Sequence, residues 1–330
     1  MSRLDGRAAL ADLRVPIPAI YWTDLGCSAG FGWAAFALAV AVPPWRPLML
    51  AATTAAIFLL YRALCFTHEI SHNRSRLPGF EAAWNLLVGY PLLLPACTYA
   101  EVHFEHHRAA TYGTRADPEY LPFARSAWLI SLFLLHALVA PVALLLRFLL
   151  LGPLALLSSR LEHVLLARAS AMTINPHYRR TVTAGLRAAL RRDQVRILAL
   201  WGPLLSLIAL GVIPARLLLL WLLVSATIGF VNALRTLVAH AYDSNGQVMT
   251  PAEQCADSID IPGGLLTELW APVGLRYHAL HHRFPGLPYH ALPRAYRRLT
   301  KGSPDHHAAM AHPGLLARLC ALWLKGVRRS

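Results

Sequence analysis

Hydrophobic residues gather in long runs along this chain, with few charged side chains inside them. Four runs approach the length that a membrane-spanning helix needs: residues 27–42, 48–66, 197–213 and 217–234. A bilayer core of about 30 Å is crossed by roughly 20 residues of helix. The first two runs form one pair and the last two form another. A short segment with proline and a single arginine separates the runs of each pair, Arg46 in the first and Arg216 in the second. The pattern therefore predicts four transmembrane helices in two hairpins.

Two further apolar stretches, residues 82–97 and 127–157, are interrupted by glycine and proline. Proline removes one helical hydrogen bond and crowds the preceding turn, so neither stretch is expected to form one straight helix. We interpret both as re-entrant or interfacial segments that leave and return on the same side of the membrane. A third full hairpin over residues 127–157 is the alternative.

The composition supports a membrane protein. Of 330 residues, 56% are hydrophobic and only 15% are charged, whereas soluble domains carry about 25% charged residues. The 31 basic residues outnumber the 17 acidic ones. Such an excess can indicate nucleic-acid binding, but here the arginines lie between apolar runs. Contact with anionic lipid headgroups explains them better, and no nucleic-acid partner is expected.

The arginines also predict the orientation. Each hairpin tip has one arginine, whereas residues 158–196 contain eight: Arg160, Arg168, Arg179, Arg180, Arg187, Arg191, Arg192 and Arg196. Positive loops stay in the cytoplasm, so both termini are expected there. The N-terminal segment 1–26 has no apolar run typical of a cleaved signal peptide. We expect an integral protein of a bacterial inner (plasma) membrane, with a single domain over residues 1–330 and a cytoplasmic tail at 301–330.

Three histidine clusters stand out against this background. Box one is His68-Glu-Ile-Ser-His72, box two is His103-Phe-Glu-His106-His107, and box three is His278-Ala-Leu-His281-His282. Helical residues three and four apart are neighbours, so each spacing gathers its imidazoles on one helix face. The predicted topology puts all three boxes on the cytoplasmic side. The expected fold is thus an all-α integral membrane protein with a cytoplasmic cap lined by histidines.

Eight imidazoles are more than one structural zinc ion needs, and they suit a site for two metal ions. The five cysteines are scattered, and no thiolate lies in a box, so an iron–sulfur cluster is not expected. Carboxylates near the boxes are expected to orient the imidazoles: Glu69, Glu101, Glu105 and Asp117. His240, at the cytoplasmic end of the last apolar run, is a ninth candidate ligand.

The remaining histidines are assigned other roles. We expect His136 to be a buried, hydrogen-bonded core residue, and His290 to support the site without binding metal. Five others are expected at the surface: His163, His177, His306, His307 and His312.

The order of the boxes resembles the membrane fatty acid desaturase family: HEISH follows one hydrophobic hairpin, HFEHH comes about thirty residues later, and HALHH follows a second hairpin. TRADPE at 114–119 and RYHALHHRFPGLPYH at 276–290 add to the resemblance, which covers roughly residues 45–300. It implies a di-iron, oxygen-dependent enzyme. The implied iron ligands are His68, His72, His103, His106, His107, His278, His281 and His282, with His240 as the extra ligand between the last span and box three.

The sequence departs from some branches of that family. Box one has three residues between its histidines rather than the four common in animal-type enzymes, and box three begins with histidine rather than glutamine. The NYxEHYG element of alkane hydroxylases is absent. His312-Pro-Gly314 is followed by too few residues for a haem domain, so electrons are expected from a separate ferredoxin- or cytochrome-type protein.

The resemblance implies oxygen-dependent desaturation of a fatty acyl chain as the leading function, with two iron ions as cofactor and O₂ as co-substrate. A hydroxylase or ketolase of the same family, acting on a lipid, carotenoid or alkane, is the alternative, because both reactions begin by removing one hydrogen from a methylene. A histidine-rich metal transporter is the alternative of another class. Transporters place ionisable residues at mid-membrane depth, whereas these boxes lie at the ends of spans.

Overall fold

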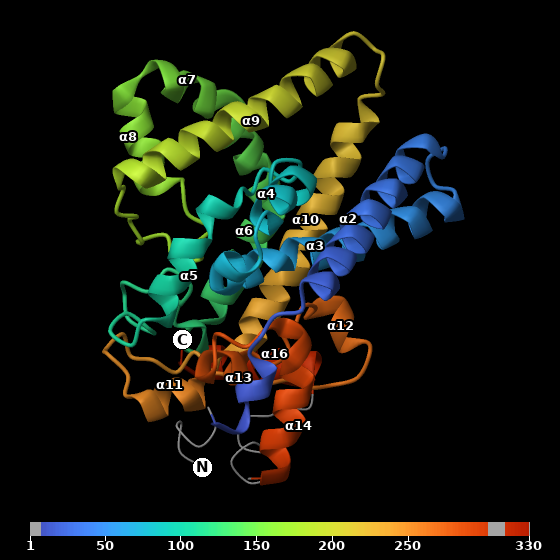
Figure 1. The fold of residues 1–330 in the computed structure, drawn as a ribbon. Helices are drawn as coiled ribbons and strands as arrows, with labels where there is room; N and C mark the ends of the chain where they lie inside the picture. The colour runs from blue at the N-terminus through green and yellow to red at the C-terminus, as the bar shows by residue number, and fades with distance from the viewer. Residues whose placement is uncertain (1–7, 303–313, 330) are drawn as a thin grey trace.

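The computed structural model describes residues 8–302 and 314–329. Within these ranges the regular structure is helical and no strand occurs, which confirms the predicted all-α fold. The longest helices extend toward one end of the molecule, and the short helices of the C-terminal part, drawn in orange and red, gather at the other (Figure 1). His306, His307 and His312 lie outside the described residues, as do parts of the predicted N-terminal segment and tail.

The first predicted hairpin is present as α2 (Pro18–Ala41) and α3 (Pro47–Asn73), which pack along each other. They approach closely at Gly32, where an added Cβ would lie 2.8 Å from Leu60 Cδ2. Small residues allow such close packing of apolar helices. Helix α3 continues past its apolar part, so that box one lies on its last turns, directly attached to a spanning helix.

The second hairpin consists of α9 (Ala184–Ala209) and α10 (Arg216–Ala239). Residues 127–157 form a continuous helical run: α6 (Ala127–Leu145), a π-helical segment (Leu146–Leu151) and α7 (Gly152–Leu157). Four helices are long and apolar enough to cross a membrane: Pro18–Ala41, Pro47–Arg76, Ala127–Leu157 and Arg216–Ala239.

The number of candidate spans is as predicted, but their identity differs at one place. The run 127–157 qualifies, whereas α9, which contains the predicted span 197–213, does not. The first half of α9 carries the charges of Arg191, Arg192, Asp193 and Arg196. Pro141 lies inside α6 without ending it, because proline in an apolar helix is tolerated where neighbouring helices and π-type adjustments compensate for the lost bond.

The chain after α7 turns back toward box two. Helix α8 (Ser159–Arg168) follows, and then the Met172 amide donates to the Thr98 carbonyl at 2.8 Å. Arg180 donates to the Cys97 carbonyl and to Glu101 at 2.8 and 2.9 Å. The run that begins at α6 is therefore followed by a segment lying against the residues that precede box two.

Residues 82–97 do not form one straight helix, as predicted, but lie in short pieces: α4 (Phe80–Trp84), a π-helical turn (Asn85–Gly89) and a 3₁₀ turn (Ala96–Thr98). The Asn85 side chain accepts a bond from the Ala96 amide at 2.8 Å and joins the two ends of this segment. Trp84 Nε1 donates to the Ala63 carbonyl at 2.7 Å and fixes the segment to α3.

The short helices at the other end include α5 (Ala100–His107), α11 (Pro251–Asp257), α12 (Thr267–Trp270), α13 (His278–Arg283), α14 (Leu292–Gly302) and α16 (Leu315–Arg329). Four 3₁₀ turns complete the helical structure: Ala11–Leu13, Arg74–Arg76, Phe123–Arg125 and Tyr289–Ala291. Isolated bridges pair His240 with Ser258 and Asp260 with Tyr277. They hold the end of α10 next to the start of α13, which carries box three.

Cysteine labelling in a cysteine-free background tests the topology. We expect Arg46→Cys and Arg216→Cys to react with an impermeant thiol reagent from outside intact cells, and Gly185→Cys to react only after lysis. The reason is the excess of arginine around position 185 over the two hairpin tips. Outside labelling at 185 would instead mean that 127–157 crosses the membrane completely and that the arginine-rich segment lies outside.

Candidate metal centre

The three boxes lie on helices, as their spacing predicts. Box one occupies the end of α3, box two occupies α5, and box three occupies α13. His240 is the residue directly after α10. These four elements are far apart in sequence, with more than two hundred residues between box one and box three. They bring their imidazoles into one buried space.

The imidazoles form two groups of four. In each group the potential ligand atoms all lie within 4.8 Å of one another: His68, His72, His103 and His281 make the first group, and His106, His240, His278 and His282 make the second. Boxes two and three contribute to both groups, whereas box one contributes only to the first. The two groups therefore lie side by side, as a centre with two metal ions requires.

His107 stands between the two groups. Its Nε2 lies 3.0 Å from Nε2 of His103 and 3.0 Å from Nε2 of His281, both in the first group. Its ring stacks on that of His282 in the second group, with centroids 4.3 Å apart. The nine histidines singled out in the sequence are thus all brought together.

Burial keeps most of these imidazoles neutral. It lowers the pKa of His103, His107, His278, His281 and His282 well below the usual value, and neighbouring imidazoles lower it further. A neutral imidazole keeps the lone pair that a metal ion binds. Several buried nitrogens have no hydrogen-bond partner: both of His68, Nε2 of His72 and Nδ1 of His278. Unpaired buried polar atoms are costly, and metal coordination is the role that suits this donor set.

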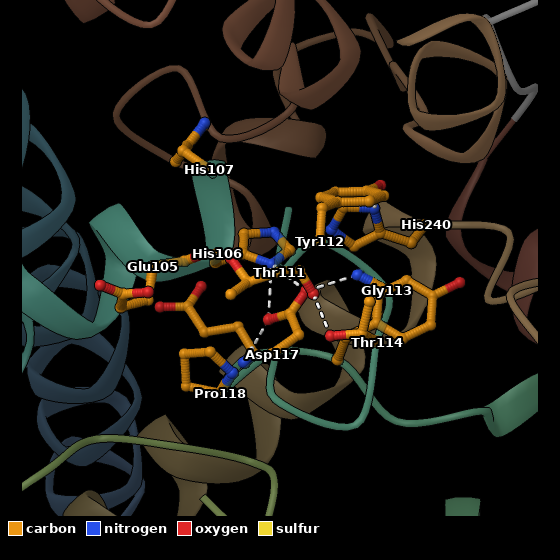
Figure 2. A network of polar contacts seen from close by, with 12 residues as sticks. Glu105, His106, His107, Thr111, Tyr112, Gly113, Thr114, Asp117, Pro118 and His240 are labelled. Carbon is orange, nitrogen blue, oxygen red and sulfur yellow. Dashed lines mark hydrogen bonds and ion pairs between the residues drawn. The ribbon is translucent and has the colours of Figure 1, made fainter. Parts of the chain in front are cut away.

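Asp117 orients His106, as predicted. Both carboxylate oxygens lie 3.0 Å from His106 Nδ1 (Figure 2). The amides of Gly113 and Glu119 donate to the same carboxylate at 2.8 and 2.9 Å. Burial acts to lower the pKa of His106, but the Asp117 carboxylate outweighs it and raises the pKa. Gly113 has φ +70°, and a Cβ there would lie 2.8 Å from Met249 Sδ, so this turn requires glycine.

Glu119 plays the same part for His103. Its carboxylate lies 3.1 Å from His103 Nδ1, and the Tyr99 hydroxyl lies 3.0 Å from the same nitrogen. Burial raises the pKa of Glu119 to about 7, although the nearby His106 opposes this shift. With Nδ1 occupied, Nε2 of His103 faces the other imidazoles.

His240 is held by partners from two other segments. The Tyr112 hydroxyl lies 2.9 Å from His240 Nδ1 and donates to Asp257 at 2.9 Å, and Asp257 itself lies 3.4 Å from that nitrogen. Asp257 ends α11, which begins with a capping box of Thr250 and Glu253. Burial lowers the pKa of His240 although Asp257 opposes it, and Nε2 of His240 lies 2.8 Å from Nε2 of His278.

The other carboxylates predicted to orient imidazoles do not bond to them. Glu69 accepts from the hydroxyl of Tyr21, the Asn73 amide group and the Tyr289 backbone amide, and its nearest oxygen lies 3.9 Å from His68 Nδ1. Glu101 pairs with Arg180, and Glu105 pairs with Arg108. The sequence prediction missed Glu119 as a partner of His103. Its position two residues after Asp117, in the TRADPE segment, was a signal that could have identified it. Asp257 and Tyr112 had no comparable signal.

Among the other histidines, His290 accepts a bond from the Ile17 amide at 3.1 Å and lies in neither group. His163 and His177 are exposed, as predicted. The prediction for His136 was wrong, because its side chain is exposed on α6 rather than buried. A helix that is apolar on every side gives no pattern from which the buried face could be predicted.

Comparison with known proteins identifies the family. The model of the family described as "Fatty acid desaturase" matches residues 43–314. The chain belongs to this family of membrane di-iron oxidoreductases. It is also similar to a ceramide hydroxylase of Caulobacter vibrioides (strain NA1000 / CB15N), with 42% identity in an alignment of 314 residues that covers 93% of this chain and 89% of the relative. No solved structure matches the chain.

These matches bear on the predicted activity. An oxidoreductase of the desaturase and hydroxylase family is confirmed, and the four candidate spans agree with an integral membrane protein. The two histidine groups are consistent with the di-metal centre typical of the family. Desaturation itself is not confirmed, and the relative favours the alternative of lipid hydroxylation.

Asp117→Asn tests the orienting carboxylate. The amide keeps the shape but removes the negative charge bonded to His106, and loss of such a partner lowers metal affinity or activity by roughly 10- to 100-fold. Metal content and turnover of the purified variant measure the effect. Glu105→Gln is the matched control from the same segment, because Glu105 bonds only to Arg108 at the surface. Equal effects of both changes would argue against the orienting role.

Proposed function

We propose that the protein hydroxylates a ceramide-like lipid at a di-iron centre, using O₂ and electrons from a separate donor protein. The observation that carries the proposal is the 42% identity to a ceramide hydroxylase over 93% of the chain. The convergence of all nine candidate histidines supports it independently.

The residues present fit two iron ions. His68, His72, His103 and His281 would hold one ion, and His106, His240, His278 and His282 the other, with His107 at the boundary between them. Imidazole is a suitable ligand for iron, and thiolates are absent from both groups. When bound, the two irons would supply the reduction of O₂ that makes an unactivated C–H bond reactive.

The overall reaction balances with one oxygen molecule. One oxygen atom enters the C–H bond as a hydroxyl group, and the other leaves as water after taking up two electrons and two protons. The electrons must come from a reductant outside this chain, and a ferredoxin- or cytochrome-type protein has the required chemistry. We place this donor, the histidine groups and both termini on the cytoplasmic side of a bacterial inner membrane.

The protein's own residues hold the site in shape and keep water out. Asp117, Glu119 and Asp257 fix the Nδ1 side of one imidazole each, on α5 and after α10. Most of these side chains are buried. Because box one and His240 end two candidate spans, a lipid could reach the centre from the bilayer without passing through water.

Desaturation of an acyl chain remains the second candidate, because the matched family carries that name. The two outcomes share the removal of a first hydrogen, and they differ in whether oxygen or a second hydrogen loss follows. The histidine geometry is compatible with both. The identity to the hydroxylase supports our choice of hydroxylation as the first candidate.

Elemental analysis tests the metal centre. We expect about two irons per chain in purified protein, and we expect His240→Ala and His106→Ala to lose iron and activity. His136→Ala is the control, because His136 lies on α6 outside both groups. Full activity of His240→Ala would remove it from the ligand set, and active protein containing only zinc would overturn the di-iron proposal.

Product analysis tests the reaction. Purified enzyme with a reducing system, ceramide and isotope-labelled O₂ should yield a lipid that has gained one labelled oxygen atom, as measured by mass spectrometry. A product that has instead lost two hydrogens, with no label, would show desaturation. Absence of both products, with iron present and electrons consumed, would exclude ceramide as the substrate.

A further inference from the structure

Helix α10 carries polar side chains along a span that is otherwise apolar after Arg216: Ser225, Thr227, Asn232, Arg235 and Thr236. All five keep part of their surface accessible. Arg235 is the only charged residue of α10 after Arg216. A charge inside a membrane span is costly and therefore usually marks a functional site.

Arg235 has hydrogen-bonding capacity left over. Its Nη2 donates to Asn232 Oδ1 at 3.1 Å and to Thr236 Oγ1 at 3.0 Å, whereas its Nε is buried without a partner. None of the ion pairs formed by the described residues includes it. Arg62, another arginine of a candidate span, is by contrast paired with Asp24 and Glu268.

The position of Arg235 relates it to the metal centre. It precedes His240 by five residues, which corresponds to about 7.5 Å along a helix axis. The helix that carries Arg235 ends directly before His240 and packs against α3, which carries box one. Arg235 therefore lies on the membrane side of the histidines.

We propose that Arg235 is a positioning residue that donates a hydrogen bond to the amide carbonyl of an N-acyl lipid. This inference rests on the proposed hydroxylation of a ceramide-like substrate and specifies how that substrate is held. The guanidinium has several donors and no acceptor, and Asn232 and Thr236 occupy only one of its nitrogens. Among the amide and hydroxyl groups of a ceramide, the carbonyl oxygen is the one that can only accept a hydrogen bond, and it therefore matches a group that can only donate.

The short distance from Arg235 to His240 limits where the hydroxyl group can enter. Only carbons close to the amide can reach the metals while the carbonyl is held, so the hydroxyl group enters near the amide rather than in the middle of the chain.

The test compares ceramide with an uncharged analogue in which a trans-alkene replaces the amide group, so that the carbonyl oxygen is absent, using full-length, iron-loaded protein in nanodiscs. A hydrogen bond from a charged group is worth about ten- to a hundredfold in affinity. Wild-type protein should prefer ceramide by that factor in kcat/KM and hydroxylate it near the amide. Arg235→Gln should lose most of the preference and spread the hydroxyl position, with unchanged iron content.

Two further variants keep the comparison decisive. Arg235→Lys keeps the charge but loses the planar set of donors, so it should show an intermediate preference. Arg147→Gln is the matched control, because Arg147 also lies in a candidate span but donates to Ala169 and Gln194. It should retain the full preference. A wild-type preference in both Arg235 variants would overturn the proposal.

Equilibrium binding to iron-free protein separates this proposal from the proposed function. The affinity of ceramide is measured by its displacement of a fluorescent ceramide. This affinity should be about ten- to a hundredfold weaker for Arg235→Gln than for wild type, whereas the affinity of the carbonyl-free analogue should be the same for both proteins. If wild type binds ceramide through Arg235 but forms no hydroxylated product, only the proposed activity fails. If palmitate displaces the probe as well as ceramide does, and only when Arg235 is present, the site binds a carboxylate and the amide assignment is wrong.

Discussion

The architecture depends on one requirement: nine imidazoles from four separate elements, six of them buried, must present lone pairs to common points. Each buried nitrogen without a partner costs about 1–3 kcal/mol, so such a cluster is sustainable only where ligation or hydrogen bonding satisfies its atoms. Burial keeps the rings neutral, and carboxylates on the outer side fix three of them: His103, His106 and His240. The long helices serve this requirement, because α3 and α10 end at the histidines and set their depth.

Much of this could be predicted from the sequence, since the relevant spacing is local. HxxxH and HxxHH place imidazoles on one helix face, and the apolar runs on either side predict the spans that carry them. Asp257 could not be predicted in the same way, because seventeen residues separate it from His240 and only the folding of α11 brings it back. The exposure of His136 and the continuous helical run over residues 127–157 were difficult to predict for another reason. An apolar helix has no polar face, and the effect of Pro141 depends on neighbouring helices rather than on its own sequence.

The choice between hydroxylation and desaturation illustrates a separate limit. Both reactions use the same metals and the same first hydrogen removal, so the ligands carry no information about the product. Information about the outcome must come from groups that touch the substrate. Arg235 and its polar neighbours on α10 differ from the histidines in this respect, because they lie on the side from which a lipid would enter.

The last helix contributes a bond that ties the end of the chain to its centre. The Arg318 side chain on α16 donates to the backbone carbonyl of His240 at 2.7 Å, and α16 also packs against α6 and α10. During synthesis, the carbonyl of His240 has to wait until position 318 has left the ribosome before this bond can form. A nascent chain with all three boxes already made would still hold His240 less firmly than the finished protein. Firm placement of His240 therefore depends on a residue that is synthesised after all three boxes.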